Sequence, residues 1–125
     1  MGYKFIIERS KTGYSAYEKK KPIFTTGKSI HELRLNALEA VNLFEEDSNK
    51  KQSSANDLQF EIDFKQFFEY YKVINSKHLA QRIGMNETLL SQYVNGKKNP
   101  SKRQIERIID GLHEIGQELT ELILV

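Results

Sequence analysis

Basic side chains are concentrated in one stretch of the sequence, between residues 72 and 107. In this stretch, two acidic residues, Glu87 and Glu106, stand against eight basic ones. The eight are Lys72, Lys77, Arg82, Lys97, Lys98, Lys102, Arg103 and Arg107. The stretch therefore carries a net charge of +6 while the whole chain carries +2, so the remaining residues sum to −4. This division predicts that one part of the chain faces a polyanion and the other a different partner, although a solvated basic surface would have the same composition.

Side chains that could catalyse a reaction or bind a metal are few and scattered. The histidines His31, His78 and His113 stand singly, without the i, i+4 pairing of a metal or acid-base site. Glu8 is alone on the first predicted strand, whereas a two-metal nuclease needs several converging carboxylates. The absence of cysteine excludes disulfides, cysteine-ligated zinc and thiol catalysis. We therefore expect no catalytic residues, no metal and no cofactor, and interpret the chain as a binding protein rather than an enzyme.

The basic block contains the pattern of two short helices joined by a tight turn. Ser76 is expected to cap the first helix, on which Leu79 and Ile83 face inward. Ala80 stands where two crossing helices leave no space for a larger side chain. Gly84 supplies the turn, because glycine readily takes the left-handed conformation that closes one helix and redirects the chain.

The second helix of the pair is expected to begin after its cap, Asn86. Its core positions are Leu90, Tyr93 and Val94, and its exposed positions are Glu87, Thr88 and Gln92. A further helix opens with a capping box of Ser101 and Gln104. Its core positions are Ile105, Ile108, Ile109 and Leu112. The pattern thus predicts a small helical domain with one polar helix face exposed.

The combined spacing resembles that of the phage-repressor-like (Cro/C1, or XRE) helix-turn-helix family. The resemblance covers about residues 64 to 122 and is carried by Leu79-Ala80, Gly84, Leu90 and Asn95-Gly96, followed by Asn99-Pro100-Ser101. In that family the second helix lies in the major groove of DNA, with its N-terminal residues at base edges. The resemblance therefore implies a lambda-repressor-like, all-α domain that binds double-stranded operator DNA.

Carried over by position, the resemblance implies two kinds of DNA contact. The implied base contacts are Glu87, Thr88 and Gln92, whose side chains can match cytosine, a thymine methyl and adenine, respectively. The implied phosphate contacts are Asn75, Ser76, Asn95, Lys97, Lys98 and Lys102. Leu89 departs from the usual polar residue at its position, and either a thymine methyl or a neighbouring subunit is its expected contact.

Residues 1 to 63 show the alternation of apolar and polar side chains that is typical of strands. Tyr3, Phe5 and Ile7 share one face of a first strand, and a turn at residues 11–13 leads to a second. A third strand is expected at residues 23–26, and a helix capped by Ser29 then runs to about Glu46. The apolar stripe of that helix is Ile30, Leu33, Ala37, Val41 and Phe44.

A polar loop over residues 47–56 precedes a fourth predicted strand, marked by the alternation of Leu58, Phe60 and Ile62. From Phe64 the apolar spacing becomes helical, which predicts the first helix of a second domain. The sequence therefore predicts an α+β protein with two domains. A β-β-β-α-β domain spans residues 1–63, and an all-α domain spans residues 64–125.

Residues 1 to 46 resemble the HicB antitoxin family, which has a degenerate ribonuclease-H-like sheet. The matching residues are Tyr3-Lys4-Phe5-Ile6-Ile7-Glu8, Gly13-Tyr14-Ser15-Ala16, Thr26-Gly27-Lys28-Ser29 and Leu38-Glu39-Ala40. The stretch at residues 18–22 is basic and lacks the glycine that the family commonly has there. The resemblance implies an antitoxin that neutralises a small, basic, HicA-like ribonuclease toxin by direct binding and represses its own operon. The alternative is a stand-alone XRE-family transcriptional regulator whose N-terminal domain senses a ligand or only dimerises.

The sequence also predicts which aromatic and apolar side chains of residues 1–63 bind a protein partner and which lie in the core. We expect Tyr14 and Tyr17 to bind a protein partner because their neighbours are polar, and Phe5, Ile7 and Phe24 to lie in the core.

Self-association is expected as well, because one helix-turn-helix buries too little surface for specific DNA binding. We therefore expect a dimer or a higher homo-oligomer. The apolar residues Leu119, Leu122, Ile123, Leu124 and Val125 are predicted to pack at a subunit contact or on the helical core. No stretch is long and apolar enough for a membrane span and the first residues lack the zones of a signal peptide, so we expect a cytoplasmic protein that binds no membrane.

Overall fold

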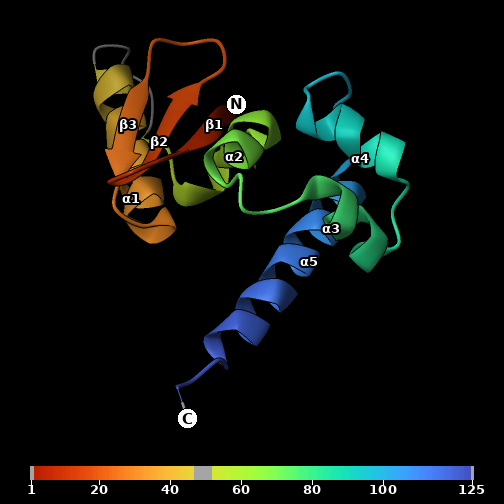
Figure 1. Cartoon of the computed structure of the whole chain (residues 1–125). Coiled ribbons are helices and arrows are strands. Elements are labelled where there is room, and N and C mark those ends of the chain that lie inside the picture. The colour runs from red at the N-terminus through yellow and green to blue at the C-terminus, as the bar shows by residue number, and fades with distance from the viewer. Residues whose placement is uncertain (1, 47–51, 125) are drawn as a thin grey trace. The chain divides into compact units, whose positions relative to one another are not determined.

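The chain folds as a mixed α+β protein. The computed structural model describes residues 2–46 and 52–124. Two compact units divide the chain, Met1–Tyr70 and Tyr71–Val125, and are called unit 1 and unit 2 below. Unit 1 contains a sheet and helices, whereas the regular elements of unit 2 are all helical within the described residues (Figure 1).

The sheet of unit 1 has four strands in the order β3-β2-β1-β4. These strands are β1 at Tyr3–Ser10, β2 at Gly13–Glu18, β3 at Phe24–Gly27 and β4 at Leu58–Ile62. β1 pairs antiparallel with β2 and parallel with β4, while β2 pairs antiparallel with β3. The helix α1 lies between β3 and β4 in the chain and spans Ile30–Glu45, so the order of elements is β-β-β-α-β as predicted.

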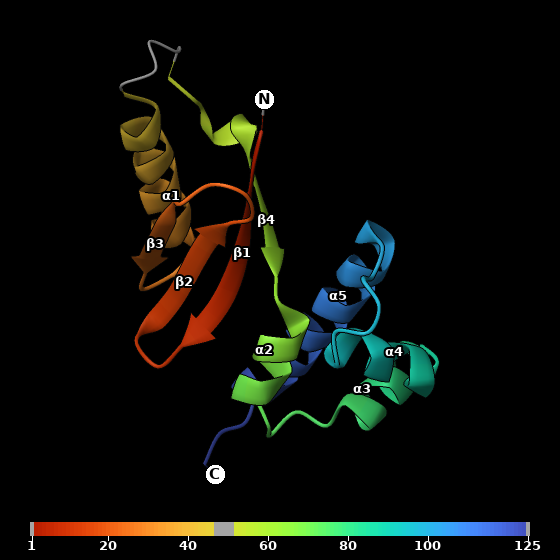
Figure 2. The same ribbon diagram turned by 90° about the horizontal axis from the view of Figure 1, so that it is seen from above.

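α1 packs against one face of the sheet (Figure 2). Leu33, Ala37 and Val41 of α1 are fully buried in the same core as Phe5 of β1. The Ser29 hydroxyl accepts a hydrogen bond from the Glu32 N–H at 3.1 Å, which confirms the predicted cap. The apolar residues that face each other across this layer therefore fix one side of the sheet as its buried side.

A second helix, α2 at Phe64–Tyr70, belongs to unit 1 and does not open unit 2. Its Gln66 amide forms two hydrogen bonds with the backbone of Arg9 in β1, at 2.8 and 2.7 Å. The Asp63 N–H just before α2 also donates to the Ile7 carbonyl at 3.1 Å. The boundary between the units therefore lies after Tyr70, whereas the sequence predicts it after residue 63.

The segment between α1 and β4 is only partly described. Residues 47–51 of the predicted polar loop lie outside the described residues, as does Val125 of the apolar tail. The described end of the loop contains a short 3₁₀ helix, Ala55–Asp57, directly before β4.

The connection from β2 to β3 is organised by a buried carboxylate, Glu18, which is 9% exposed. It accepts hydrogen bonds from three backbone N–H groups, those of Lys4 at 2.9 Å, Lys20 at 2.6 Å and Lys21 at 2.9 Å. Burial by itself would raise the pKa of Glu18, but the three N–H donors and the charge of Lys21 hold that pKa below its ordinary value of 4.5. In its charged form, Glu18 therefore stabilises the backbone of the basic stretch at residues 18–22.

Over its described residues, 71–124, unit 2 contains three helices, α3 at Ser76–Ile83, α4 at Glu87–Val94 and α5 at Lys102–Thr120. The buried residues of these helices and their turns are Leu79, Ala80, Met85, Leu90, Tyr93, Ile108 and Gly111. Gly111 lets α5 approach α3 closely, because a Cβ atom there would lie 2.4 Å from Cγ2 of Ile83. This small core holds α3 and α4 in a fixed relation to the first half of α5.

Candidate functional site

α3 and α4 are joined by a tight turn whose geometry follows from two residues. Gly84 has a φ of 70°, in the left-handed region, and Met85 donates a backbone hydrogen bond to Ala80 at 2.9 Å. The side-chain oxygen of Asn86 accepts from the Leu89 N–H at 3.0 Å and caps α4. The predicted turn and the predicted cap of the second helix are both confirmed.

The cap of α3 differs from the prediction by one residue. Asn75, not Ser76, is the N-cap, and its side-chain oxygen accepts from the His78 N–H at 3.1 Å. Ser76 is the first helical residue, and its side chain is free to face the groove described next. Both residue types cap helices well, so composition alone does not choose between them.

A groove of about 430 Å³ runs along one face of α4. Its lining residues come from α3, α4 and the loop that follows α4; they are Ser76, Lys77, Glu87, Thr88, Ser91, Gln92, Asn95 and Lys97. The groove thus brings together the three side chains expected to contact bases with three of the six expected to contact phosphates. Ser91 lies at helical spacing from Glu87 and Thr88, and Lys77 belongs to the basic block, but neither is among the contacts that the resemblance implies.

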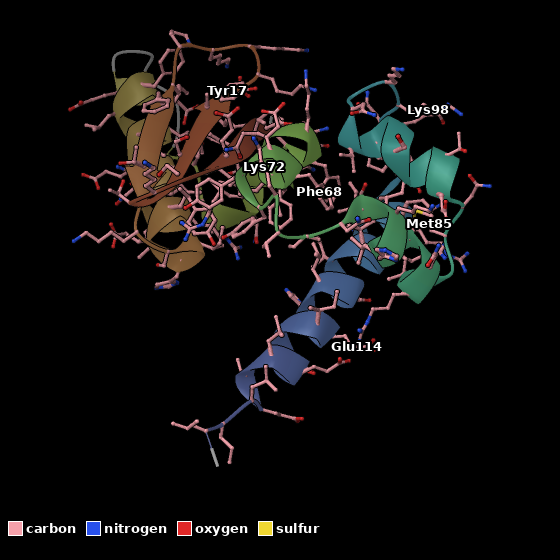
Figure 3. The ribbon with its side chains drawn as sticks, in the orientation of Figure 1. Tyr17, Phe68, Lys72, Met85, Lys98 and Glu114 are labelled. Atoms are coloured by element: carbon pink, nitrogen blue, oxygen red, sulfur yellow. The ribbon has the colours of Figure 1, made fainter. Side chains whose placement is uncertain are left out.

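Three expected phosphate contacts, Asn75, Lys98 and Lys102, do not line the groove. All three side chains are exposed, and all three residues lie close to groove residues in the sequence. Figure 3 shows Lys98 on the loop after α4. This loop is held to α4 because the Lys97 and Lys98 N–H groups both donate to the Gln92 carbonyl, at 2.9 and 3.2 Å. The two lysines are therefore presented on a fixed backbone turn rather than on a free loop.

Glu87 is positioned by a neighbour that the sequence did not indicate. The Gln81 amide of α3 donates to the Glu87 carboxylate at 2.7 Å. Glu87 also lies in the first turn of α4, where the helix dipole favours a negative charge. A carboxylate held in this way can accept a hydrogen bond from a cytosine amine without first losing much side-chain freedom.

Two of the eight basic residues, Arg82 and Arg107, have partners within unit 2. Arg82 forms ion pairs with Glu114, at 3.3 Å, and with Glu118, both on α5. Arg107 donates to the carbonyls of Ile83 and Gly84 at 3.1 Å each, at the C-terminal end of α3. The exposed members of the basic block are Lys72, Lys77, Arg82, Lys97, Lys98, Lys102 and Arg103.

The face of the sheet in unit 1 opposite α1 carries a row of apolar side chains across three strands. Ile6 of β1 pairs with Tyr17 of β2, and Tyr17 pairs with Phe24 of β3. Tyr17 is 40% and Phe24 65% exposed, so the prediction that Phe24 lies in the core is wrong. Ile23, one residue earlier, is the buried one, because neighbouring residues of a strand point to opposite faces.

The two tyrosines expected to bind a partner do not share a surface. Tyr14 is packed against the core, and the Arg9 guanidinium lies 4.6 Å from its ring centre. Tyr17 lies on the opposite face, where burial raises its pKa and the negative charges of Glu8 and Asp63 raise it further. The row formed by Ile6, Tyr17 and Phe24, called the open-face row below, thus has acidic neighbours.

Among residues 2–46 and 52–124, no group of three or more metal-binding side chains comes together, and no helix is long and apolar enough to span a membrane. The chain has no match among protein-family models and none among curated protein sequences.

Proposed function

We propose that unit 2 binds duplex DNA in a sequence-specific manner through the exposed face of α4. The observation that carries this proposal is the groove along α4, in which Glu87, Thr88 and Gln92 lie beside Ser76, Asn95 and Lys97. Hydrogen-bonding groups that can read base edges are there flanked by groups that can hold phosphates. The helix-turn-helix resemblance of the sequence assigns the same helix to the major groove.

The backbone supports the same use of this face. α4 is eight residues long, is capped at its N-terminus by Asn86 and is fixed to the core by the fully buried Leu90. The N-terminal half of α4 therefore presents its polar side chains from a rigid element, which favours specific readout over loose electrostatic binding. Lysines on the loop after α4 then set the register on the phosphate backbone.

Two experiments with the full chain test the proposal. The first selects tight binders from a pool of random duplexes, and the second measures the affinity for them at several salt concentrations. We expect a recovered consensus sequence and a linear fall of log affinity with log salt. If Lys77, Lys97, Lys98 and Lys102 each neutralise one phosphate, the slope is about −3 to −4 per bound copy. Recovery of no consensus, with equal affinity for every duplex, would contradict sequence-specific binding.

A second proposed function, neutralisation of a small basic toxin, concerns unit 1. The open-face row favours it, because exposed aromatic side chains beside Glu8 and Asp63 suit a partner surface that is both apolar and basic. The HicB resemblance of the sequence implies this type of partner and also repression of its own operon through unit 2. The alternative is a transcriptional regulator whose unit 1 senses a ligand or only dimerises.

Replacing Phe24 by lysine is expected to abolish binding of a small basic toxin, to be sought in a neighbouring reading frame, because the new positive charge repels a basic partner. The change adds a charge to the open-face row at an exposed position of an edge strand, so the fold should tolerate it. Leu35→Lys, at a 56% exposed position of α1, adds the same charge elsewhere on unit 1 and serves as the control. Co-purification of full-length variants with that gene product, together with rescue of growth, measures the effect. Equal binding by both variants would exclude the open-face row as the toxin site.

A further inference from the structure

The turn between α3 and α4 is tied to α5 by the side chain of Arg107. Its guanidinium donates to the carbonyls of Ile83 and Gly84, at 3.1 Å each. It also donates to the side-chain oxygen of Gln104, at 2.9 Å. Ile83 is the last residue of α3 and Gly84 is its C-cap, so both carbonyls belong to the end of this helix. One guanidinium therefore holds the end of α3 and a turn of α5 at the same time.

The end of a helix suits this contact for a physical reason. The last carbonyls of an α-helix have no hydrogen-bond partner within the helix, and they carry the partial negative charge of the helix dipole. A basic side chain in the last turn of the same helix can donate to them. In α3 that side chain is Arg82, which pairs instead with Glu114 and Glu118 of α5. The cation at the end of α3 is therefore supplied by another helix, and it fixes the two helices to each other.

A second, independent contact holds the same residue of α3. Gly111 lies one helical turn after Arg107, on the same side of α5. A Cβ atom at Gly111 would clash with Cγ2 of Ile83, so the Ile83 side chain packs directly on the α5 backbone. Ile83 is thus held through its carbonyl by Arg107 and through its side chain by Gly111. Two contacts one turn apart fix both the position and the direction of the chain as it leaves α3.

The chain that leaves α3 leads directly to the groove along α4. Two residues separate Gly84 from Glu87, the first residue of α4, and Glu87 and Thr88 both line the groove. A base contact needs its atoms placed to within about 0.5 Å. A small shift of the turn would therefore disturb base contacts at the start of α4, whereas flexible lysine side chains could follow the phosphates across the same shift.

We propose that Arg107 is a positioning residue for DNA recognition, which touches no DNA itself and places the first residues of α4 by clamping the turn before them to α5. This inference rests on the proposed reading of bases by α4. The planar guanidinium is essential to the role. A lysine at this position would carry the same charge but would lack the rigid set of donors that reaches three acceptors at once.

Affinities of the full chain for the selected duplex and for a scrambled duplex of the same composition test this role. We expect Arg107→Lys and Arg107→Gln to lower the ratio of the two affinities about tenfold, which is the effect of one lost base contact, and to leave the salt slope unchanged. Lys102→Gln removes the same charge from the exposed start of α5 and serves as the matched control. It should weaken binding to both duplexes alike, make the salt slope shallower by about 1 and leave the ratio unchanged.

The ratio of affinities also separates positioning from a loss of stability. A smaller folded fraction reduces both affinities by the same factor, so it leaves the ratio at its wild-type value. A wild-type ratio for Arg107→Lys would overturn the proposal, because charge alone would then suffice. A shallower salt slope for Arg107→Gln, with the ratio unchanged, would assign Arg107 to a phosphate and overturn the proposal as well.

Amide NMR spectra of the free chain distinguish a failure of this inference from a failure of the proposed function. Without DNA, Arg107→Lys should shift the amides of Met85, Glu87 and Thr88, whereas Lys102→Gln should leave them in place. If the wild type discriminates between duplexes but these shifts are absent, the clamp is wrong and base reading by α4 stands. If the shifts appear but the wild type binds every duplex equally, base reading is wrong, and the role of Arg107 in DNA recognition with it.

Discussion

Gln92→Ala is expected to lower the affinity for the selected duplex by about 1–3 kcal/mol and to relax the preference at one base position. Gln92 lies in the groove along α4, where its amide can donate to and accept from one adenine. The loss should therefore vanish when that base pair is changed, because the interaction is already absent from the altered duplex. Competition binding against duplexes substituted one position at a time measures this effect.

Lys98→Ala provides the contrast, because Lys98 is exposed on the loop after α4 and outside the groove. Its loss should weaken binding to all duplexes alike and make the salt slope shallower by about 1. Lys28→Ala removes an exposed lysine from unit 1 and should change neither quantity. If Gln92→Ala and Lys98→Ala give the same uniform loss, α4 does not read bases.

Glu18→Gln is expected to destabilise unit 1 by about 1–3 kcal/mol at neutral pH, because one carboxylate oxygen is replaced by an NH₂ group that cannot accept a hydrogen bond. Glu18 is buried and accepts from three backbone N–H groups, so at least one of them loses its partner. Urea unfolding at several pH values measures the difference between variant and wild type.

The pH dependence of this difference follows from the lowered pKa of Glu18. A carboxyl group whose pKa is lower in the folded state contributes stability above the unfolded pKa and loses it as the pH falls through the folded pKa. The wild-type advantage should therefore be complete at neutral pH, decline below about pH 4.5 and shrink further at lower pH. Glu39→Gln, at an exposed position of α1, should show no such loss. A difference that does not change with pH would contradict the role of the charged carboxylate.

The parts of the fold that depend on local chemistry could be predicted from the sequence. Gly84 and Asn86 specify a turn and a cap by their own conformational and hydrogen-bonding preferences. The two helices that they separate, α3 and α4, and the exposed positions of α4 could therefore be predicted. The alternation of Tyr3, Phe5 and Ile7 likewise located β1 and its buried face.

The parts that depend on pairing between distant residues could not be predicted in the same way. A shift of one residue moves a strand side chain to the other face, so the pairing of β3 with β2 leaves Phe24 exposed, while Ile23, one residue earlier, is buried. The hydrogen bonds of Gln66 with β1, which assign α2 to unit 1, join residues far apart in sequence. The same holds for Arg82, a member of the basic block whose ion-pair partners Glu114 and Glu118 lie on α5.

The most direct test of DNA binding by α4 is an amide NMR titration of the full chain with the selected duplex and with a scrambled duplex of the same composition. We expect the selected duplex to shift the amides of Ser76, Lys77, residues 87–92 and residues 95–98 in slow exchange, because these residues form or flank the groove along α4. The scrambled duplex should shift mainly the amides of residues 97–102, in fast exchange and with loss at higher salt, since only phosphate contacts remain. Identical shifts with both duplexes, or shifts confined to residues outside α4 and its groove, would contradict sequence-specific binding by this helix.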